Sequence, residues 1–169
     1  MVALSDTRSF VVNAREVPWR QRDGLGRWAD LEGDADFDEL GFQISVVDPG
    51  IPVCMYHGES VTEDFLVVSG ECLLVIEGEE RHLKQWDFVH CPPWTEHVFV
   101  GAGDGPCAIV MVGARRAEAD EEIIYPVNEV AARHDASVRE TTPEPAEAYA
   151  RFTRRDPSPY RVGDLPDLG

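Results

Sequence analysis

The fold of this chain is decided by the stretch from His57 to His97, which reads HGESVTEDFLVVSGECLLVIEGEERHLKQWDFVHCPPWTEH. It consists of short apolar runs rich in β-branched and aromatic residues, and Gly and Pro turn signals separate them. Such runs at this spacing are typical of an antiparallel sandwich or barrel. No long amphipathic pattern interrupts them, which argues against a parallel α/β sheet.

The same pattern continues on both sides of this stretch. Before it, Phe42, Ile44 and Val46 alternate with polar or smaller residues and end at the turn Asp48-Pro49-Gly50. We therefore predict an all-β domain of seven or eight strands. The predicted strands are 42–46, 52–56, 65–68, 72–76, 81–83, 88–91, 98–100 and 107–112.

Four residues in the stretch have side chains that bind metal ions: His57, Glu59, Glu63 and His97. Imidazole and carboxylate together suit a divalent Zn, Fe, Mn or Ni ion, which would keep open positions for substrate. His57 and Glu59 are two residues apart, so in an extended segment both point to one face. A slip of one residue would turn both away and present Tyr56 instead.

With these residues laid out, the chain resembles the cupin superfamily over roughly residues 41–113. Glu63 and Gly70 have the spacing of the second half of the first cupin motif, and counting back from Glu63 places His57 and Glu59 at its two His positions. Counting forward from Gly50 places Tyr56 and Gly58 there instead. We prefer the first count, because it puts a competent ligand at both positions.

The second cupin motif is matched in spacing from Trp86 to His97, with Pro92 and His97 in place. Trp86 and Trp94 stand where the family has glycines, and Gly101 replaces the closing Asn. The resemblance implies a double-stranded β-helix, which is a small antiparallel barrel of two packed sheets. It also implies a metal bound by three His and one Glu, carried over here to His57, Glu63 and His97, with Glu59 as the departure.

Each of these residues also has a simpler explanation. Glu63 can be an exposed residue at a strand entry, His97 a hydrogen-bonded structural His, and His57 and Glu59 parts of a solvated loop. If Glu59 is not a ligand, it is a candidate general base beside the ion. Aromatic residues around a few polar groups are the usual lining of a small-molecule site, and they are also ordinary barrel packing. The possible pocket residues are Tyr56, Phe65, Cys91, Trp94 and Phe99.

The 169 residues suit one domain with extensions on both sides. We predict an N-terminal arm over 1–40 with a possible edge strand at 10–12, a barrel over 41–114, and an acidic tail over 115–169. The tail contains two short predicted helices, one capped by Asn128 and one opened by Thr142-Pro143. Its Pro-rich end, 156–160, is either extended or mobile.

Composition limits the partners of the protein. A net charge of −17 makes nucleic acid a poor partner. The longest apolar run, 107–112, is too short to span a membrane, and 1–10 lacks a secretory signal, so we expect a cytoplasmic protein. The four cysteines form no CxxC pair and indicate neither a disulfide framework nor a zinc ribbon.

The resulting hypothesis is a metal-binding, cupin-like protein with a pocket for a small organic molecule. One interpretation is that the protein is a metal-dependent enzyme of the isomerase, decarboxylase or dioxygenase type. The alternative is a module that binds or senses a small molecule without turnover, since a fold alone does not imply catalysis. Open sheet edges near 10–12 or 42–46 lead us to expect a homodimer.

Overall fold

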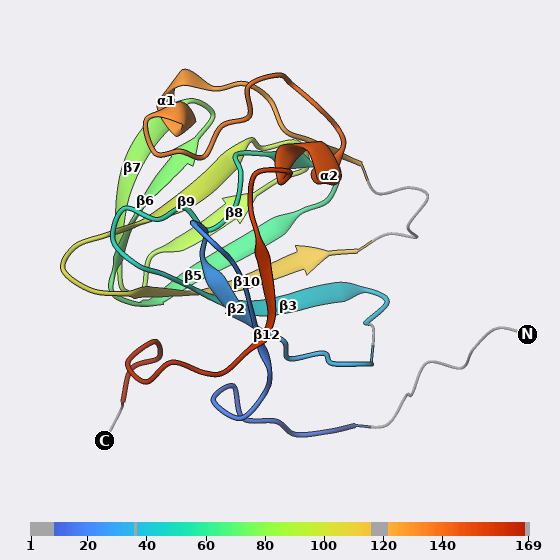
Figure 1. Cartoon of the computed structure of the whole chain (residues 1–169), viewed down its shortest axis with the longest axis vertical. Coiled ribbons are helices and arrows are strands. Elements are labelled where there is room, and N and C mark those ends of the chain that lie inside the picture. Colours follow the sequence, from blue (N-terminus) through green and yellow to red (C-terminus); the bar gives the residue numbers. More distant parts are fainter. Residues whose placement is uncertain (1–8, 36, 116–121, 168–169) are drawn as a thin grey trace, which may run out of the picture.

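Two antiparallel sheets that face one another form the body of the protein (Figure 1). The computed structural model describes residues 9–35, 37–115 and 122–167; residues 1–8 of the predicted arm and 116–121 of the predicted tail lie outside it. The larger sheet has the order β12-β1-β2-β3-β10-β5-β8, and the smaller has the order β7-β6-β9. Strands β4 and β11 form a separate pair. The strands are β1 (Trp19–Arg22), β2 (Arg27–Ala29), β3 (Leu40–Val47), β4 (Gly58–Glu59), β5 (Glu63–Ser69), β6 (Glu71–Ile76), β7 (Glu79–Lys84), β8 (Phe88–Cys91), β9 (His97–Ala102), β10 (Cys107–Ala114), β11 (Ile123–Ile124) and β12 (Arg154–Ser158).

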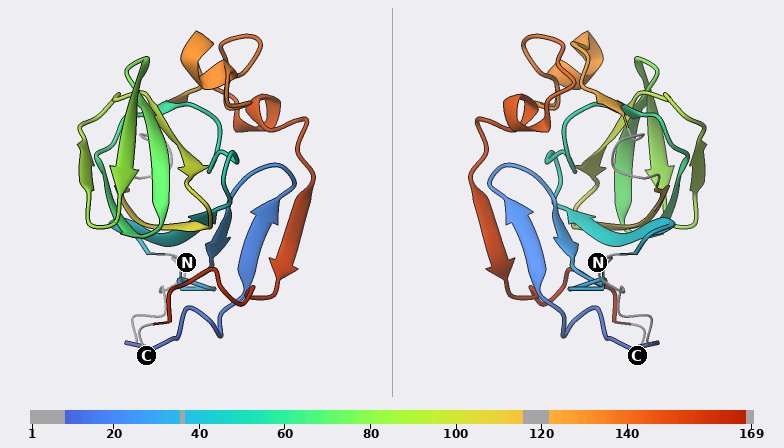
Figure 2. Two further views of the ribbon diagram at one scale, coloured as in Figure 1. Left: turned by 90° about the vertical axis from the view of Figure 1, so that its left-hand side faces the viewer. Right: turned by 90° about the vertical axis from the view of Figure 1, so that its right-hand side faces the viewer.

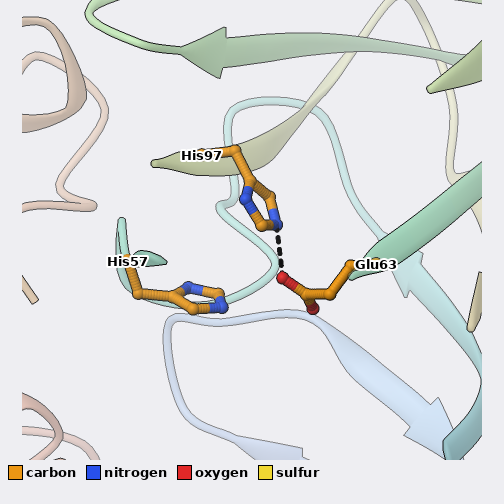
Figure 3. A group of neighbouring side chains, drawn as sticks. All are labelled: His57, Glu63 and His97. Carbon is orange, nitrogen blue, oxygen red and sulfur yellow. Dashed lines mark ion pairs between the residues drawn. The ribbon is translucent and has the colours of Figure 1, made fainter. Parts of the chain in front are cut away.

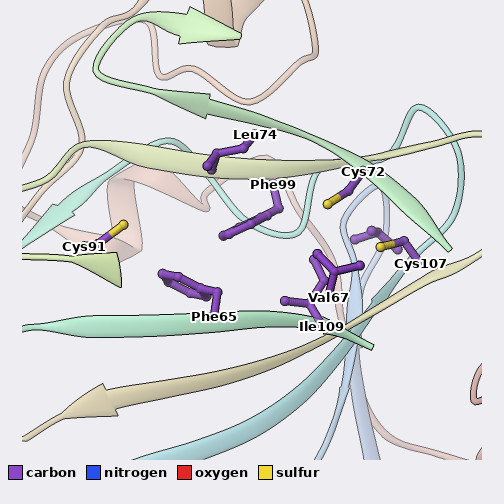
Figure 4. Packing of buried hydrophobic residues seen from close by; sticks show 9 residues of the cluster. Phe65, Val67, Cys72, Leu74, Cys91, Phe99, Cys107 and Ile109 are labelled. Carbon is purple, nitrogen blue, oxygen red and sulfur yellow. The ribbon is translucent and has the colours of Figure 1, made fainter. Parts of the chain in front are cut away.

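The core lies between the two sheets (Figure 4). Alternation along β5 turns Phe65 and Val67 inward, and Phe99 on β9 faces them with its ring centroid 4.8 Å from that of Phe65. This arrangement confirms the all-β, double-stranded β-helix prediction. The buried members of the cluster are Val47, Phe65, Val67, Cys72, Leu74, Cys91, Phe99, Cys107 and Ile109.

Alternation also carries polar residues into this interior. Glu63 is two residues before Phe65, and His97 is two residues before Phe99, so each lies on the core-facing side of its strand. The other face of β9 is buried too, because Val98 packs with Tyr56 and with Ala131 of α1 (Glu129–Ala132). The strand pattern therefore aims two metal-binding side chains at the inside of the barrel.

Backbone conformation supports the alignment of the second motif. Trp86 and Trp94, which occupy its glycine positions, have φ values of 76° and 69°. This left-handed region favours glycine and is uncommon for a large side chain. The tight turn at Gly70 has the same character: φ is +74°, and a Cβ would lie 2.5 Å from the carbonyl oxygen of Pro106.

Segments from both ends of the chain extend the larger sheet. Figure 2 shows β1 and β12 side by side next to the barrel, where Trp19 pairs with Ser158. The end of the tail is thus extended, and Pro157 lies in an edge strand, where its missing N–H is tolerated. Trp19 is fully buried against the outer face of the barrel.

Three local predictions were wrong. Residues 10–12 form no strand, and Val11 is 99% exposed, because β12 already pairs with the outer edge of β1. Residues 52–56 cross between the sheets and form only an isolated bridge from Pro52 to Val100. Strand β3 is not an edge, since it lies between β2 and β10, so neither segment offers the open edge on which the dimer expectation rested.

The two short helices lie at one end of the barrel (Figure 1). Asn128 caps α1 as predicted, because its side-chain oxygen accepts from the N–H groups of Val130 and Ala131. Helix α2 is Pro145–Ala148, and it begins after Glu144 rather than at Thr142. No helix in the described part of the chain is both long and apolar enough to cross a membrane.

Candidate metal centre

Three predicted ligands converge inside the barrel: His57, Glu63 and His97 (Figure 3). His57 lies just before β4 and is joined to His97 by a pair of backbone hydrogen bonds of 3.2 and 2.8 Å. Glu63 begins β5 and His97 begins β9. One ligand atom from each residue lies within 4.8 Å of the others. Ligands bound 2.0–2.2 Å from one ion are about 3 to 4 Å apart, so a small closure would complete a site.

Both imidazoles are oriented by backbone carbonyls. The Nδ1 atom of His57 is 2.8 Å from the carbonyl oxygen of Met55, and that of His97 is 3.0 Å from the carbonyl oxygen of Thr95. A carbonyl only accepts, so each Nδ1 carries a proton, and Nε2 is the ring nitrogen left to face the site. This is how metal-binding histidines are commonly held.

The Nε2 atoms face carboxylates. His97 Nε2 lies 3.5 Å from Glu63 Oε2, and His57 Nε2 lies 3.3 Å from Glu59 Oε1. His57 is 8% exposed and His97 is 2% exposed, so the donors lie in a largely desolvated position. Two imidazoles and one carboxylate form the donor set of a site with open coordination positions, so these residues fit a divalent transition metal.

Glu59 lies beside the three-residue group. It lies on β4, and its carboxylate contacts His57 rather than joining the set that lies within 4.8 Å. Burial would raise the pKa of Glu59, but its hydrogen bond to His57 and the charges of His57 and His97 lower it. Glu59 is therefore ionised at neutral pH, and it remains a candidate for a fourth ligand or a base.

The two histidines differ in their protonation. Burial and the neighbouring His57 lower the pKa of His97 to about 4, so His97 is neutral and its Nε2 is free to bind a metal. Burial also opposes a proton on His57, yet the adjacent Cys54 and Glu59 raise the pKa of His57 well above its usual value. Without metal, the site is therefore held together by a His57–Glu59 ion pair.

A cavity of about 390 Å³ opens onto the candidate centre. His57, Glu59 and Glu63 line one part of it, and its volume is in the range of small-molecule sites. Its walls include aromatic residues from several elements: Trp28, Phe42, Tyr125 and Tyr149. A larger cavity of about 580 Å³ lies near the C-terminal helices, and none of the residues of the candidate centre lines it.

The five predicted pocket residues are not gathered around the cavity. Phe65 packs on the centre, with its ring centroid 5.0 Å from that of His97, and it lies in the core cluster with Phe99 and Cys91. Tyr56 packs on the outer side of the smaller sheet, where its hydroxyl accepts from the N–H of Gly78. Trp94 lies on a loop and is 47% exposed.

Sequence reasoning missed the cavity residues contributed by other segments. Cys54 lines the cavity, with its sulfur 3.7 Å from His57 Nδ1, and Tyr125 packs on the His57 ring at a centroid distance of 5.8 Å. Arg22 and Tyr149 also line it. Arg22, Tyr125 and Tyr149 lie outside both motifs, and their proximity depends on contacts between distant segments. Cys54 lies within the first motif, but at none of its ligand positions.

Comparison with known proteins agrees with the observed fold. Residues 43–113 match a family model described as a cupin domain. No curated protein matches the chain. Among solved structures, a sugar phosphate isomerase from Silicibacter pomeroyi matches with a TM-score of 0.58 and 18% identity, over 92% of this chain and 99% of that one.

Two further structures are similar over the barrel. The polyketide cyclase RemF from Streptomyces resistomycificus matches with a TM-score of 0.56 and 16% identity, over 63% of this chain and 80% of that one. A predicted oxalate decarboxylase from Thermotoga maritima matches with a TM-score of 0.55 and 17% identity, over 63% of this chain and 100% of that one. At these identities the likeness is one of fold.

Proposed function

Because residues 43–113 form a cupin domain and the chain thus belongs to the cupin superfamily, we propose that it is a metal-dependent enzyme that acts on a small organic molecule. His57, Glu63 and His97 would hold a divalent ion, with Zn, Fe, Mn and Ni as candidates. The observation that carries the proposal is the orientation of both imidazoles, whose Nδ1 atoms lie against backbone carbonyls so that Nε2 is left for a metal.

The bound ion would supply Lewis acidity to a substrate oxygen. This chain's own residues would do the rest. Glu59 would move a proton next to the ion, since its ionised carboxylate lines the same cavity. Phe65 would shield the centre from water on the core side, because its ring packs on His97. Isomerisation, decarboxylation and oxygenation are all compatible with this arrangement.

The structural neighbours support a proposal of this kind without choosing the reaction. Their names include an isomerase, a cyclase and a predicted decarboxylase. One barrel therefore serves different reactions, and the side chains of each site decide among them. A cytoplasmic location and a homodimer remain expectations from the sequence, and light scattering at micromolar concentration would test the second.

Elemental mass spectrometry on untagged protein, purified without chelators, tests the proposal. We expect about one metal ion per chain, the ratio for a single site of this kind. Glu63→Gln and His97→Ala are expected to lose it. His90→Ala is the matched control, because His90 is exposed and pairs with Asp64 outside the centre.

Metal retention by both ligand variants would overturn the proposal. Metal-free wild-type protein with a stable fold would favour the alternative, a binding module without turnover. The ion pair of His57 with Glu59 is a feature that would close such a site without a metal.

A further inference from the structure

The cavity has an uneven distribution of charge. At the candidate centre it is lined by the carboxylates of Glu59 and Glu63, which a divalent ion would neutralise. Two arginines, Arg22 and Arg115, also line it. Arg115 is already neutralised, because it donates to both carboxylate oxygens of Glu32 at 2.8 and 2.9 Å and to the carbonyl oxygen of Phe37 at 2.5 Å.

Arg22 is in a different situation. It ends β1, and its guanidinium carbon lies 4.2 Å from the centroid of the Tyr149 ring. Among the described side chains, no carboxylate forms an ion pair with it. A ring beneath the guanidinium occupies its face, whereas its N–H groups lie in the guanidinium plane and remain available to an acceptor.

Aromatic contacts connect Arg22 to the candidate centre. Tyr149 packs edge-on against Tyr125 with a centroid distance of 5.6 Å, and Tyr125 packs on His57 at 5.8 Å. All four residues line the same cavity. A molecule in this cavity would therefore lie among the metal centre, aromatic rings and a cation.

From this arrangement we infer that Arg22 binds an anionic group of the substrate, so that the protein acts on small organic acids or phosphate esters. The inference rests on the proposed function, since it places the other end of the substrate at the metal. A carboxylate and a phosphate both accept two parallel N–H bonds from a guanidinium. In a chain of net charge −17, a cavity arginine that pairs with no carboxylate of the described residues gives local attraction for an anion that the molecule as a whole repels.

Three probes with one ring and different head groups test the inference: benzoate, phenyl phosphate and neutral benzamide. Their ring suits the aromatic wall, and calorimetry gives the affinity of each. We expect wild-type protein to bind at least one of the two anions about tenfold or more tightly than benzamide. The tighter anion indicates whether the natural head group is a carboxylate or a phosphate.

Arg22→Gln is expected to lose about 10- to 100-fold in affinity for that anion and to bind benzamide as wild type does. Arg81→Gln is the matched control, because it removes the same charge from an exposed position on β7. Arg22→Lys gives the same test if Arg22→Gln is unstable, since an ammonium lacks the paired donors and should bind the anion about tenfold more weakly.

Circular dichroism verifies the fold of each variant. Wild-type anion affinity in the folded variants, or no preference for an anion over benzamide, would overturn the inference.

Failure of this inference can be distinguished from failure of the proposed function. Metal content is measured in the same samples, and Arg22→Gln is expected to retain the wild-type amount. If wild-type protein binds no metal, the proposed function fails, yet the anion preference and its dependence on Arg22 are still measured. If chelation abolishes anion binding and Arg22→Gln does not weaken it, the anion binds at the metal, and only the inference fails.

Discussion

At the scale of the residue, the candidate centre depends on how each side chain is held. His57 and His97 are held by the carbonyl oxygens of Met55 and Thr95, each two residues earlier in the chain. Glu63 is held by its strand, which turns it to the same side as Phe65. The ligand positions are therefore fixed by local backbone structure, and we expect them to be present before a metal binds.

Glu59 and Glu63 are predicted to differ in their effect on metal binding. Glu63 belongs to the three-residue group, whereas Glu59 contacts the group through His57. Glu59→Gln should weaken metal binding about 10- to 100-fold, because it removes a negative charge beside the ion. Glu63→Gln should abolish stoichiometric binding. Competition with a chromophoric chelator measures the metal affinity of both variants. Equal losses would contradict this difference and indicate that Glu59 binds the metal directly, as Glu63 does.

Trp86 is predicted to be strained by its backbone. Its φ of 76° is costly for a residue with a Cβ, and its side chain is 68% exposed, so replacing it removes little packing. Trp86→Gly should be more stable than Trp86→Ala by up to about 1 kcal/mol, because both lose the ring and only glycine relieves the strain. Urea unfolding compares the two. A more stable alanine variant would contradict this account.

At the scale of the element, a network of ion pairs joins the C-terminal segment to the barrel. Arg27 on β2 forms a close ion pair with Asp164 and a 3.1 Å pair with Asp48, which follows β3. Arg161 contacts Asp48 at 2.6 Å and Asp164 at 3.0 Å. Arg27 is 5% exposed and Asp164 is 2% exposed, so the pair is desolvated and its removal is expected to be costly.

Asp164→Ala should lower the free energy of unfolding by about 3 kcal/mol, because it leaves Arg27 buried with Asp48 as its remaining ion-pair partner among the described side chains. Asp167→Ala is the matched control. Asp167 pairs with Arg15 at the surface, where such a pair contributes about 0 to 1 kcal/mol. Chemical denaturation measures both variants. A similar small effect in both would mean that the buried network does not stabilise the C-terminal segment.

The same network predicts a dependence of stability on pH. Burial would raise the pKa of Asp48, but its hydrogen bonds to Arg161 and Arg27 outweigh this and lower it. A group whose pKa is lower in the folded state stabilises the fold above its unfolded value, about 4, and loses this contribution as pH falls. Asp48→Asn should therefore destabilise the protein at pH 6 and much less at pH 3. A constant difference between those two pH values would contradict the assignment.

At the scale of the whole molecule, the sequence predicted the barrel better than its surroundings. Alternation and turn residues fixed most core strands, because those signals are local. The motif spacing also located His57, Glu63 and His97, which the structure brings within 4.8 Å. Trp86 and Trp94 confirm the positions of the motif glycines by their backbone rather than by their side chains.

The β1–β12 pairing and the cavity depend on contacts between distant segments, which local sequence patterns do not predict. Strands β1 and β12 are at least 132 positions apart in the sequence and pair only in the folded chain. Arg22, Tyr125 and Tyr149 likewise reach the cavity from separate segments. Tyr56 was misplaced because the chain crosses between the sheets at that point instead of continuing a strand. The sequence thus predicted the metal ligands but not the residues that form the cavity beside them.

A crystal structure with anomalous scattering at the metal edge would show whether a metal ion binds between His57, Glu63 and His97. We predict one strong anomalous peak per chain, about 2.0 to 2.2 Å from Nε2 of both histidines and from a carboxylate oxygen of Glu63. A peak bound elsewhere, or well-ordered side chains with no peak in protein supplied with Zn, Fe, Mn and Ni, would contradict it.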